Sequence, residues 1–150
     1  MSIIVSKSFE NQLPEDDTNV KTLNDLQILV VDDDADTLIL ITIILEDYGI
    51  QVKTATSASE ALEVIRHFEL DLLIIDIAMP EEDGYSLICK VRALENTQKR
   101  KMPAIALTAL DTEEARQLAF KSGFQNYLIK PFDSSELVTQ IAKLLVESTY

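Results

Sequence analysis

The sequence is short of residues that interrupt regular structure or cross-link a chain: its 150 residues include three glycines, four prolines, one cysteine and no tryptophan. A single cysteine excludes a disulfide framework within the chain, as is usual in a reducing compartment. Residues 38–45 form the longest nearly apolar run, which is far too short to span a bilayer, and residues 1–10 lack the features of a signal peptide. We therefore expect a cytoplasmic protein without membrane insertion.

Basic residues are also scarce, with 13 Lys and Arg against 26 Asp and Glu and a net charge of −13. Such an acidic surface repels phosphate backbones, so we expect no direct binding to nucleic acid. The chain is nevertheless 47% hydrophobic, with a mean hydropathy of +0.08, and is long enough for one well-filled core. The excess of acid leaves open that several carboxylates converge on a cation.

The start of the chain differs from the rest. Residues 1–25 are polar and acidic with little periodicity, which predicts a flexible or loosely docked N-terminal extension. A short strand at residues 3–5 is compatible with the sequence. We predict one domain over residues 26–147 and a C-terminal tail at residues 148–150.

Within the predicted domain, apolar runs alternate with amphipathic segments. The predicted strands are residues 28–31, 51–55, 72–75, 104–107 and 127–129. The segments with helical periodicity are residues 37–47, 57–68, 87–94, 115–123 and 133–145. Runs that are apolar on both faces are typical of a parallel sheet covered by helices on both sides. The predicted fold class is therefore α/β, a doubly wound five-stranded parallel sheet with five helices.

Local patterns give further expectations. The segment 37–47 is apolar on nearly all sides, so we expect this helix to be well covered. Ser57 with Glu60 and Asp133 with Glu136 have the spacing of helix N-caps. The basic stretch at residues 98–101 is predicted to be a solvated loop.

Chemically active side chains follow four of the five predicted strands. In chain order they are Asp32, Asp33, Asp76, Thr108 and Lys130. The carboxyl ends of parallel strands form one edge, where ligands bind, so we expect these side chains to meet. The three aspartates offer the hard oxygen ligands that Mg²⁺ prefers. Asp76 could also act as a nucleophile toward phosphorus, with Lys130 and Thr108 contacting the phosphoryl oxygens.

Several short motifs around these positions resemble the defining motifs of response-regulator receiver domains. They are Val31-Asp32-Asp33, Ile75-Asp76, Met79-Pro80 with Asp83-Gly84, Leu107-Thr108-Ala109 and Lys130-Pro131-Phe132. Each motif is weak alone, but together they are highly specific, and the resemblance covers the whole predicted domain. It implies a flavodoxin-like receiver fold and a signalling switch of a two-component system.

The resemblance also implies a chemistry. Asp76 would accept a phosphoryl group from the phosphohistidine of a sensor histidine kinase or of a histidine phosphotransfer protein. Mg²⁺, for which Mn²⁺ could substitute, would be held by Asp32, Asp33, Asp76 and the backbone carbonyl of Ala78. The chain would not be an enzyme with a separate substrate, but would catalyse its own phosphotransfer and dephosphorylation.

A conformational switch is implied as well. Thr108 would move toward the phosphoryl group, and Tyr127 would turn into the space that it leaves. An aromatic residue in an apolar run is also a common core residue, so Tyr127 has a purely structural alternative. The bond between Lys130 and Pro131 would be cis. Output would reach a protein partner through the surface of the fourth helix, fifth strand and fifth helix, and a homodimer is a further option.

Two positions depart from the common receiver pattern. Ala78, two residues after Asp76, and Leu110, two residues after Thr108, are both apolar. Many receivers carry polar groups there, which help a water molecule attack the phosphoaspartate. Our hypothesis is that autodephosphorylation is slow.

Three other functions compete with the receiver interpretation. A phosphatase or phosphotransferase of the haloacid dehalogenase type also uses an aspartate and Mg²⁺, but residues 76–78 lack the second acid of its Asp-x-Asp arrangement. A degenerate receiver would bind partners without accepting phosphate. A nucleotide-binding flavodoxin-like protein would need a glycine-rich loop after the first strand, and none is present. We expect a stand-alone receiver, with a piece of a larger regulator or hybrid kinase as the rival.

Overall fold

The computed structural model describes residues 23–149, with side chains described for residues 23–145. The first 22 residues of the predicted extension, including the strand at residues 3–5, lie outside this part. The described chain begins with a short 3-10 helix, η1 (Leu23–Asp25), whose Leu23 is buried in the core. The boundaries after residues 25 and 147 stay predictions.

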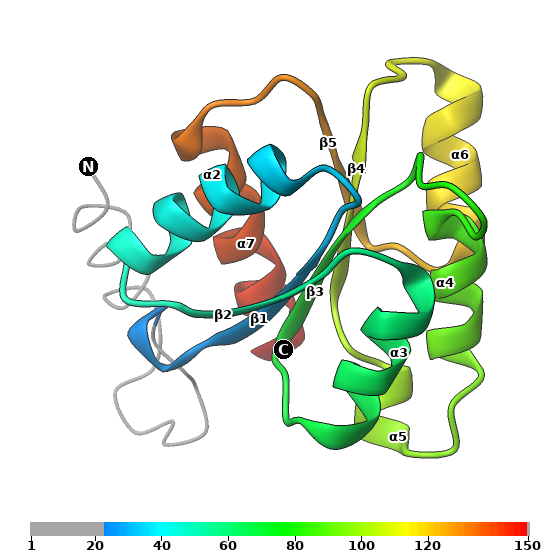
Figure 1. The fold of residues 1–150 in the computed structure, drawn as a ribbon, viewed down its shortest axis with the longest axis horizontal. Helices are drawn as coiled ribbons and strands as arrows, with labels where there is room; N and C mark the ends of the chain where they lie inside the picture. Colours follow the sequence, from blue (N-terminus) through cyan, green and yellow to red (C-terminus); the bar gives the residue numbers. More distant parts are fainter. Residues whose placement is uncertain (1–22, 150) are drawn as a thin grey trace.

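Five parallel strands form one sheet in the order β2-β1-β3-β4-β5 (Figure 1). The strands are β1 (Gln27–Val31), β2 (Gln51–Ala55), β3 (Leu72–Asp76), β4 (Ala104–Thr108) and β5 (Asn126–Ile129). Strands β3 and β4 are buried at every position, which accounts for their continuous apolar runs. Because every pairing is parallel, the carboxyl ends of all five strands lie at one edge. The predicted doubly wound fold is confirmed.

The described residues form six α-helices, one more than predicted. They are α2 (Ala35–Asp47), α3 (Ala58–His67), α4 (Gly84–Arg92), α5 (Thr97–Arg100), α6 (Glu113–Ser122) and α7 (Ser134–Thr149). Both predicted N-caps are confirmed: Ser57 Oγ accepts a hydrogen bond from the backbone N–H of Glu60 at 3.2 Å, and Asp133 Oδ1 accepts one from that of Glu136 at 2.8 Å. Within residues 23–149, no helix combines the length and the apolar character needed to cross a bilayer.

The additional helix is α5, and the prediction of a solvated loop there was wrong. The side chain of Asn96 caps this helix by accepting from the backbone N–H of Lys99 at 3.0 Å. Lys99 Nζ in turn donates to the carbonyls of Ile65 and Arg66, at 2.6 and 2.7 Å. The basic stretch is therefore anchored to the end of α3, where a cation also complements the helix dipole.

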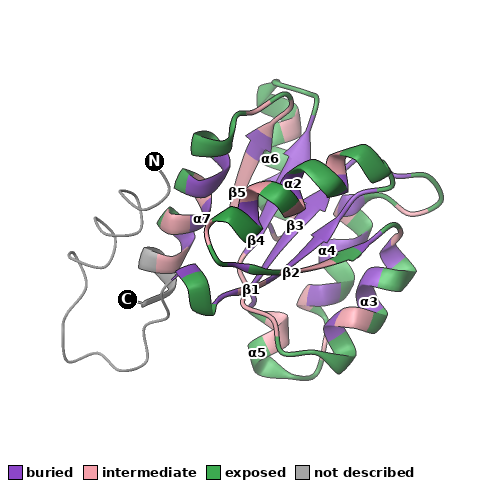
Figure 2. Cartoon of the chain, turned by 60° about the vertical axis from the view of Figure 1, so that its left-hand side comes forward, coloured by how far each residue is buried: buried purple, intermediate pink, exposed green. Residues whose placement is uncertain are grey.

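Helices cover both faces of the sheet, so its strands lie in the buried centre of the molecule (Figures 1 and 2). On one side, which we call the α2/α7 face, Ile28 and Val30 of β1 pack with side chains of α2 and α7. On the other side, the α4/α6 face, Leu29 and Val31 pack with α3, α4 and α6. This alternation follows from the two-residue period of a strand.

Helix α2 is less covered than its sequence suggested. Its inner side buries Leu38, Ile41 and Leu45, but Ile39, Leu40 and Ile43 are each more than half exposed. The helix packs on the sheet with one side only, so the expectation that it is well covered was wrong.

Candidate functional site

The predicted site residues lie at the carboxyl edge of the sheet. Asp76 and Thr108 are the last residues of β3 and β4, while Asp32 directly follows β1 and Lys130 directly follows β5. The alternation along each strand divides them between the two faces. Asp32, Asp76 and Lys130 continue the even positions that face α2 and α7, and Thr108 continues the positions that face α4 and α6.

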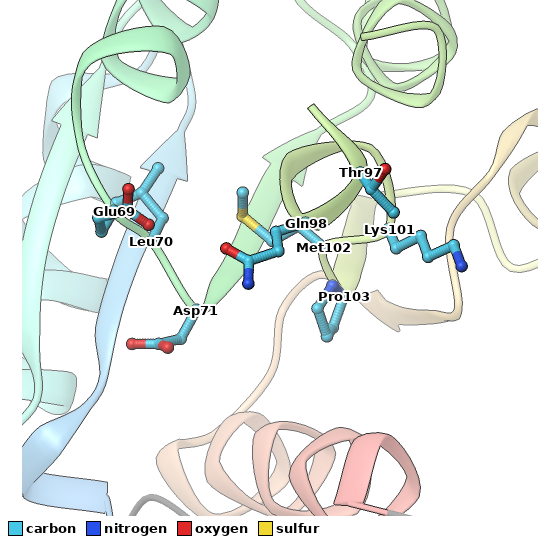
Figure 3. A pocket seen from close by; sticks show the side chains of 8 residues that line it. All are labelled: Glu69, Leu70, Asp71, Thr97, Gln98, Lys101, Met102 and Pro103. Atoms are coloured by element: carbon cyan, nitrogen blue, oxygen red, sulfur yellow. The ribbon is translucent and has the colours of Figure 1, made fainter. Parts of the chain in front are cut away.

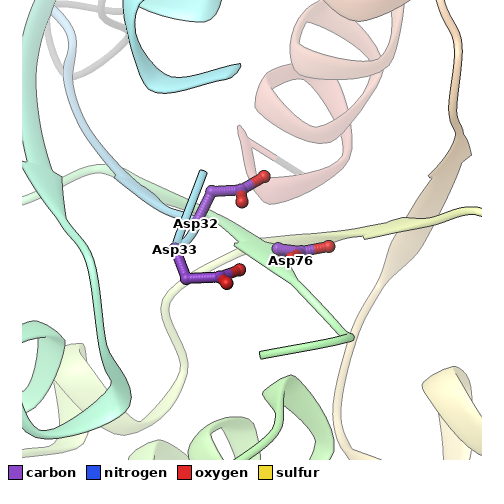
Figure 4. A group of neighbouring side chains, drawn as sticks. All are labelled: Asp32, Asp33 and Asp76. Carbon is purple, nitrogen blue, oxygen red and sulfur yellow. The ribbon is translucent and has the colours of Figure 1, made fainter. Parts of the chain in front are cut away.

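Three carboxylates gather beyond β1 and β3 (Figure 4). Oxygens of Asp32, Asp33 and Asp76 all lie within 4.8 Å of one another. Asp32 is 1% exposed and Asp76 is 4% exposed, whereas Asp33 is open to solvent. Oδ1 of Asp32 also accepts a hydrogen bond from the backbone N–H of Asp34 at 2.9 Å, which fixes its orientation. Two buried carboxylates beside an exposed one leave a site that solvent ions can enter.

Lys130 is the counter-ion of the buried acids. Its Nζ donates to Oδ2 of Asp32 and to Oδ1 of Asp76, at 3.0 Å each. Burial lowers the pKa of Lys130, but the hydrogen bonds and charges of the two aspartates outweigh that effect, and the pKa is raised overall. Lys130 therefore stays protonated at neutral pH.

Asp76 is the carboxylate whose ionisation the fold opposes. Burial raises the pKa of Asp76, and the charges of Asp32 and Asp33 raise it further. The hydrogen bond from Lys130 acts in the opposite direction without cancelling the other effects. Additional positive charge at this point would stabilise the ionised form.

This donor set suits a hard divalent cation. Carboxylate oxygens are the ligands that Mg²⁺ takes in proteins, usually alongside several waters. The predicted fourth donor is the backbone carbonyl of Ala78, an exposed residue two positions after β3. The three acids thus meet the chemical requirement for such an ion from their own side chains.

A glycine allows the backbone around Asp76 to pack closely. The backbone N–H of Gly84, the first residue of α4, donates to the carbonyl of Ile77 at 2.9 Å. A Cβ at position 84 would lie 2.6 Å from the Asp76 carbonyl oxygen and 2.9 Å from Ile77 Cα. Only glycine fits this approach without a shift of the strand end.

Thr108 completes the edge next to β3. It is buried, and its Oγ1 accepts a hydrogen bond from the backbone N–H of Leu110 at 3.0 Å. Leu110 itself, two residues beyond β4, is apolar and 58% exposed. The peptide bond between Lys130 and Pro131, the predicted cis candidate, is cis.

Tyr127 lies on the α4/α6 face, away from the acids. Its ring packs against that part of the core, and its hydroxyl accepts a hydrogen bond from Arg116 Nε of α6 at 2.7 Å. Sequence reasoning missed Arg116, because it is an exposed residue on the polar side of a helix and nothing in its local pattern points to a strand residue.

A separate pocket of about 570 Å³ lies at the opposite edge of the sheet (Figure 3). It is lined by residues that precede β3 and β4, namely 69–71, 97–98 and 101–103. None of the predicted site residues contributes to it. The hollow is therefore unrelated to the acidic cluster.

Comparison with known proteins agrees with this geometry. The family model of the response regulator receiver domain matches residues 28–142. The uncharacterized 14.6 kDa protein of the sodA1 3' region of Leptolyngbya boryana is 49% identical over 119 residues, which are 79% of this chain and 89% of that protein. Among other relatives are the transcriptional regulatory protein PrrA of Mycobacterium bovis and the response regulator SaeR of Staphylococcus aureus, each 35% identical, and the chain spans about half the length of each.

Solved structures of receiver domains have the same fold. A CheY-like receiver domain protein from Methanospirillum hungatei JF-1 superposes with a TM-score of 0.74 and 30% identity, over 81% of this chain and 94% of that one. The receiver domain of sensor histidine kinase PA1611 from Pseudomonas aeruginosa PAO1, which has a magnesium ion coordinated in its active site cleft, gives 0.72 and 30% over 81% and 98%. With a family match over most of its length, the chain belongs to the response regulator receiver domains.

Proposed function

We propose that the chain is a phosphorylation-dependent switch of a two-component system in which Asp76 accepts a phosphoryl group from a phosphohistidine. The observation that carries the proposal is the position of Lys130 Nζ, 3.0 Å from both Asp76 Oδ1 and Asp32 Oδ2. A fixed cation at a buried carboxylate is suited to a transfer in which negative charge accumulates on phosphoryl oxygens.

In the proposed step, a carboxylate oxygen of Asp76 attacks the phosphorus atom of the phosphohistidine. A P–O bond forms and the P–N bond to the imidazole breaks, so the imidazole leaves with the bonding electron pair and takes a proton from solvent. Lys130 offsets the charge of the phosphoryl oxygens, and the Thr108 hydroxyl donates a hydrogen bond to one of them. In dephosphorylation a water oxygen replaces the Asp76 oxygen on phosphorus, which releases inorganic phosphate.

We further propose a Mg²⁺ site formed by Asp32, Asp33 and Asp76 with the backbone carbonyl of Ala78, and acceptance of Mn²⁺ there. The mutual distances and burial of the three carboxylates support this assignment. When bound, the cation supplies the charge neutralisation that lets a phosphoryl group approach a carboxylate. The magnesium ion in the PA1611 receiver domain gives independent support.

The proposed donor is a sensor histidine kinase or a histidine phosphotransfer protein, and the site of action is the cytoplasm. We propose that output reaches a protein partner through the surface of α6, β5 and α7. Tyr127 belongs to β5 and contacts α6, so a change at the strand ends can be transmitted to this surface. A homodimer through the same surface is a further form of output.

The test is uptake of label from phosphoryl-labelled acetyl phosphate in the presence of Mg²⁺. We expect labelling of the wild-type chain and of Asp111→Asn, a control that removes an exposed acid, and none of Asp76→Asn. Labelling of Asp76→Asn would overturn the assignment. A wild-type chain that binds neither Mg²⁺ nor beryllofluoride would be a degenerate receiver, and repeated turnover of a small phosphate ester would indicate the dehalogenase-type alternative.

A further inference from the structure

Arg116 and Tyr127 form a close pair outside the acidic site. Arg116 Nε donates to the Tyr127 hydroxyl at 2.7 Å, and the guanidinium carbon lies 4.9 Å from the centre of the Tyr127 ring. Phe120, also on α6, packs edge-on against the same ring, with ring centres 6.1 Å apart and an interplanar angle of 84°. Helix α6 thus holds the ring of Tyr127 through its hydroxyl and through its π-system.

One strand, β4, separates Tyr127 on β5 from Asp76 at the end of β3. In the parallel pairing of β4 with β5, Ala106 is opposite Tyr127 and Thr108 is opposite Ile129. Thr108, Ala106 and Tyr127 share the α4/α6 face, and the small side chain of Ala106 is what β4 places beside the ring. Space released by a movement of Thr108 would therefore open toward Tyr127.

We propose that Arg116 is a positioning residue that restrains Tyr127 in its present arrangement and thereby disfavours the phosphorylated conformation. This inference rests on the proposed function. Tyr127 cannot turn toward Thr108 without giving up both the hydrogen bond and the cation–π contact with Arg116. The free energy of these contacts favours the unswitched state. It therefore lowers the population of the switched state and the apparent affinity for any ligand that requires that state.

The restraint has a regulatory consequence. The side chain of Arg116 is exposed on α6, so a protein partner can take up its guanidinium group with an acidic side chain. Such a partner would free Tyr127 and raise the apparent affinity of the site for the phosphoryl group. By linkage, phosphorylation would raise the affinity for that partner by the same factor.

The test is the affinity for beryllofluoride in Mg²⁺, measured by ¹⁹F NMR titration of the full chain. We expect Arg116→Ala to bind about threefold to tenfold more tightly, from the loss of one hydrogen bond and one exposed cation–π contact. Lys121→Ala, which removes an exposed positive charge from the same helix, is the matched control and should not tighten binding. Loss of positive charge alone would weaken the binding of an anion, so the expected effect has the opposite sign.

Thermal unfolding without beryllofluoride separates a restraint from a merely structural contact. Arg116→Ala should lower Tm slightly while it raises the affinity, whereas a structural contact would not raise the affinity. In a Tyr127→Phe background the Arg116→Ala effect should be smaller, because the hydroxyl is already absent. An effect of full size in that background would show that Arg116 does not act through Tyr127.

The outcomes for this inference and for the proposed function differ. If the wild-type chain does not bind beryllofluoride, the proposed function fails and the restraint with it. If the wild-type chain binds it and Arg116→Ala binds equally or more weakly, the restraint is overturned while the proposed function stands.

Discussion

Nζ of Lys130 donates to Oδ1 of Asp76 at 3.0 Å although the two residues are 54 positions apart in the chain. Lys130 follows the edge strand β5, Asp76 ends β3, and β4 lies between these strands. The long lysine side chain therefore reaches past one strand to neutralise a buried acid. The same ammonium group contacts Asp32 beyond β1, so one cation links three of the five strands.

Replacement of Lys130 by methionine tests this relationship. We expect the rate of labelling from acetyl phosphate to fall roughly a hundredfold, because a fixed positive charge at the phosphoryl oxygens is lost. We also expect the free energy of unfolding in urea to fall by about 1–3 kcal/mol, since the buried Asp32 and Asp76 lose a partner that is itself partly exposed. Lys130→Arg, which keeps the charge, should lose less stability. Labelling of Lys130→Met at the wild-type rate would exclude Lys130 from the proposed step.

Asp76→Asn should stabilise the protein when chelator removes divalent cations. Folding raises the pKa of Asp76 through burial and through the charges of Asp32 and Asp33. An acid with a raised pKa makes its full contribution to stability at pH values below its unfolded pKa, and this contribution is lost as the pH rises through the folded pKa. Ionised Asp76 therefore opposes folding at pH 7. We expect Tm of Asp76→Asn to be a few degrees higher at pH 7, with the gain disappearing below about pH 4.

Mg²⁺ should reverse this difference. A cation bound by the three aspartates stabilises the wild-type fold by mass action and stabilises Asp76→Asn less, because one ligand is missing. Asp111→Asn is the matched control and should behave like the wild type with and without Mg²⁺. A lower Tm of Asp76→Asn in chelator would show that the Lys130 pairing outweighs the burial of the carboxylate.

Most of the fold and the edge residues could be predicted because they depend on patterns within short segments. Apolar runs on both faces identify β3 and β4, and the residues that end them, Asp76 and Thr108, follow directly. Helix α5 was missed because it has only four residues and depends on Lys99, which contacts a carbonyl 34 positions away. Local sequence carries no signal for such a contact.

The exposure of Ile39 and the pairing of Arg116 with Tyr127 were missed for a related reason. A sequence shows which sides of a helix are apolar, but not which of them another element covers. The register of α6 on β5 decides that Arg116 meets a strand residue 11 positions later. Both facts are properties of packing between elements.

Gly84→Ala should damage the site more than its effect on stability explains. The added Cβ would lie 2.6 Å from the Asp76 carbonyl oxygen, so the end of β3 must shift. We expect a loss of about 1–3 kcal/mol in the free energy of unfolding, together with a lower labelling rate per folded molecule. The matched control is Gly49→Ala. Gly49 has a positive φ of 83°, and an added Cβ would lie 2.8 Å from that of Asn24. This glycine precedes β2, so it lies at the opposite edge of the sheet from the acids. The control substitution should cost stability but leave labelling unchanged, and equal labelling of both variants would remove Gly84 from the site.

Phosphorylated Asp76 should be long-lived, because the two side chains best placed to assist water are apolar. The side chain of Ala78 has no hydrogen-bonding group, and Leu110, two residues after Thr108, has an exposed aliphatic side chain. A hydrolytic water would have to be oriented by such a group, so we expect the label to persist for minutes or longer after the donor is removed in Mg²⁺. Ala78→Asn introduces an amide that can orient the water by a hydrogen bond and should shorten that lifetime roughly tenfold, on the scale of one hydrogen bond. Ala78→Val keeps the position apolar and should leave the lifetime unchanged. A wild-type lifetime of seconds would show that neither apolar position protects the phosphoaspartate.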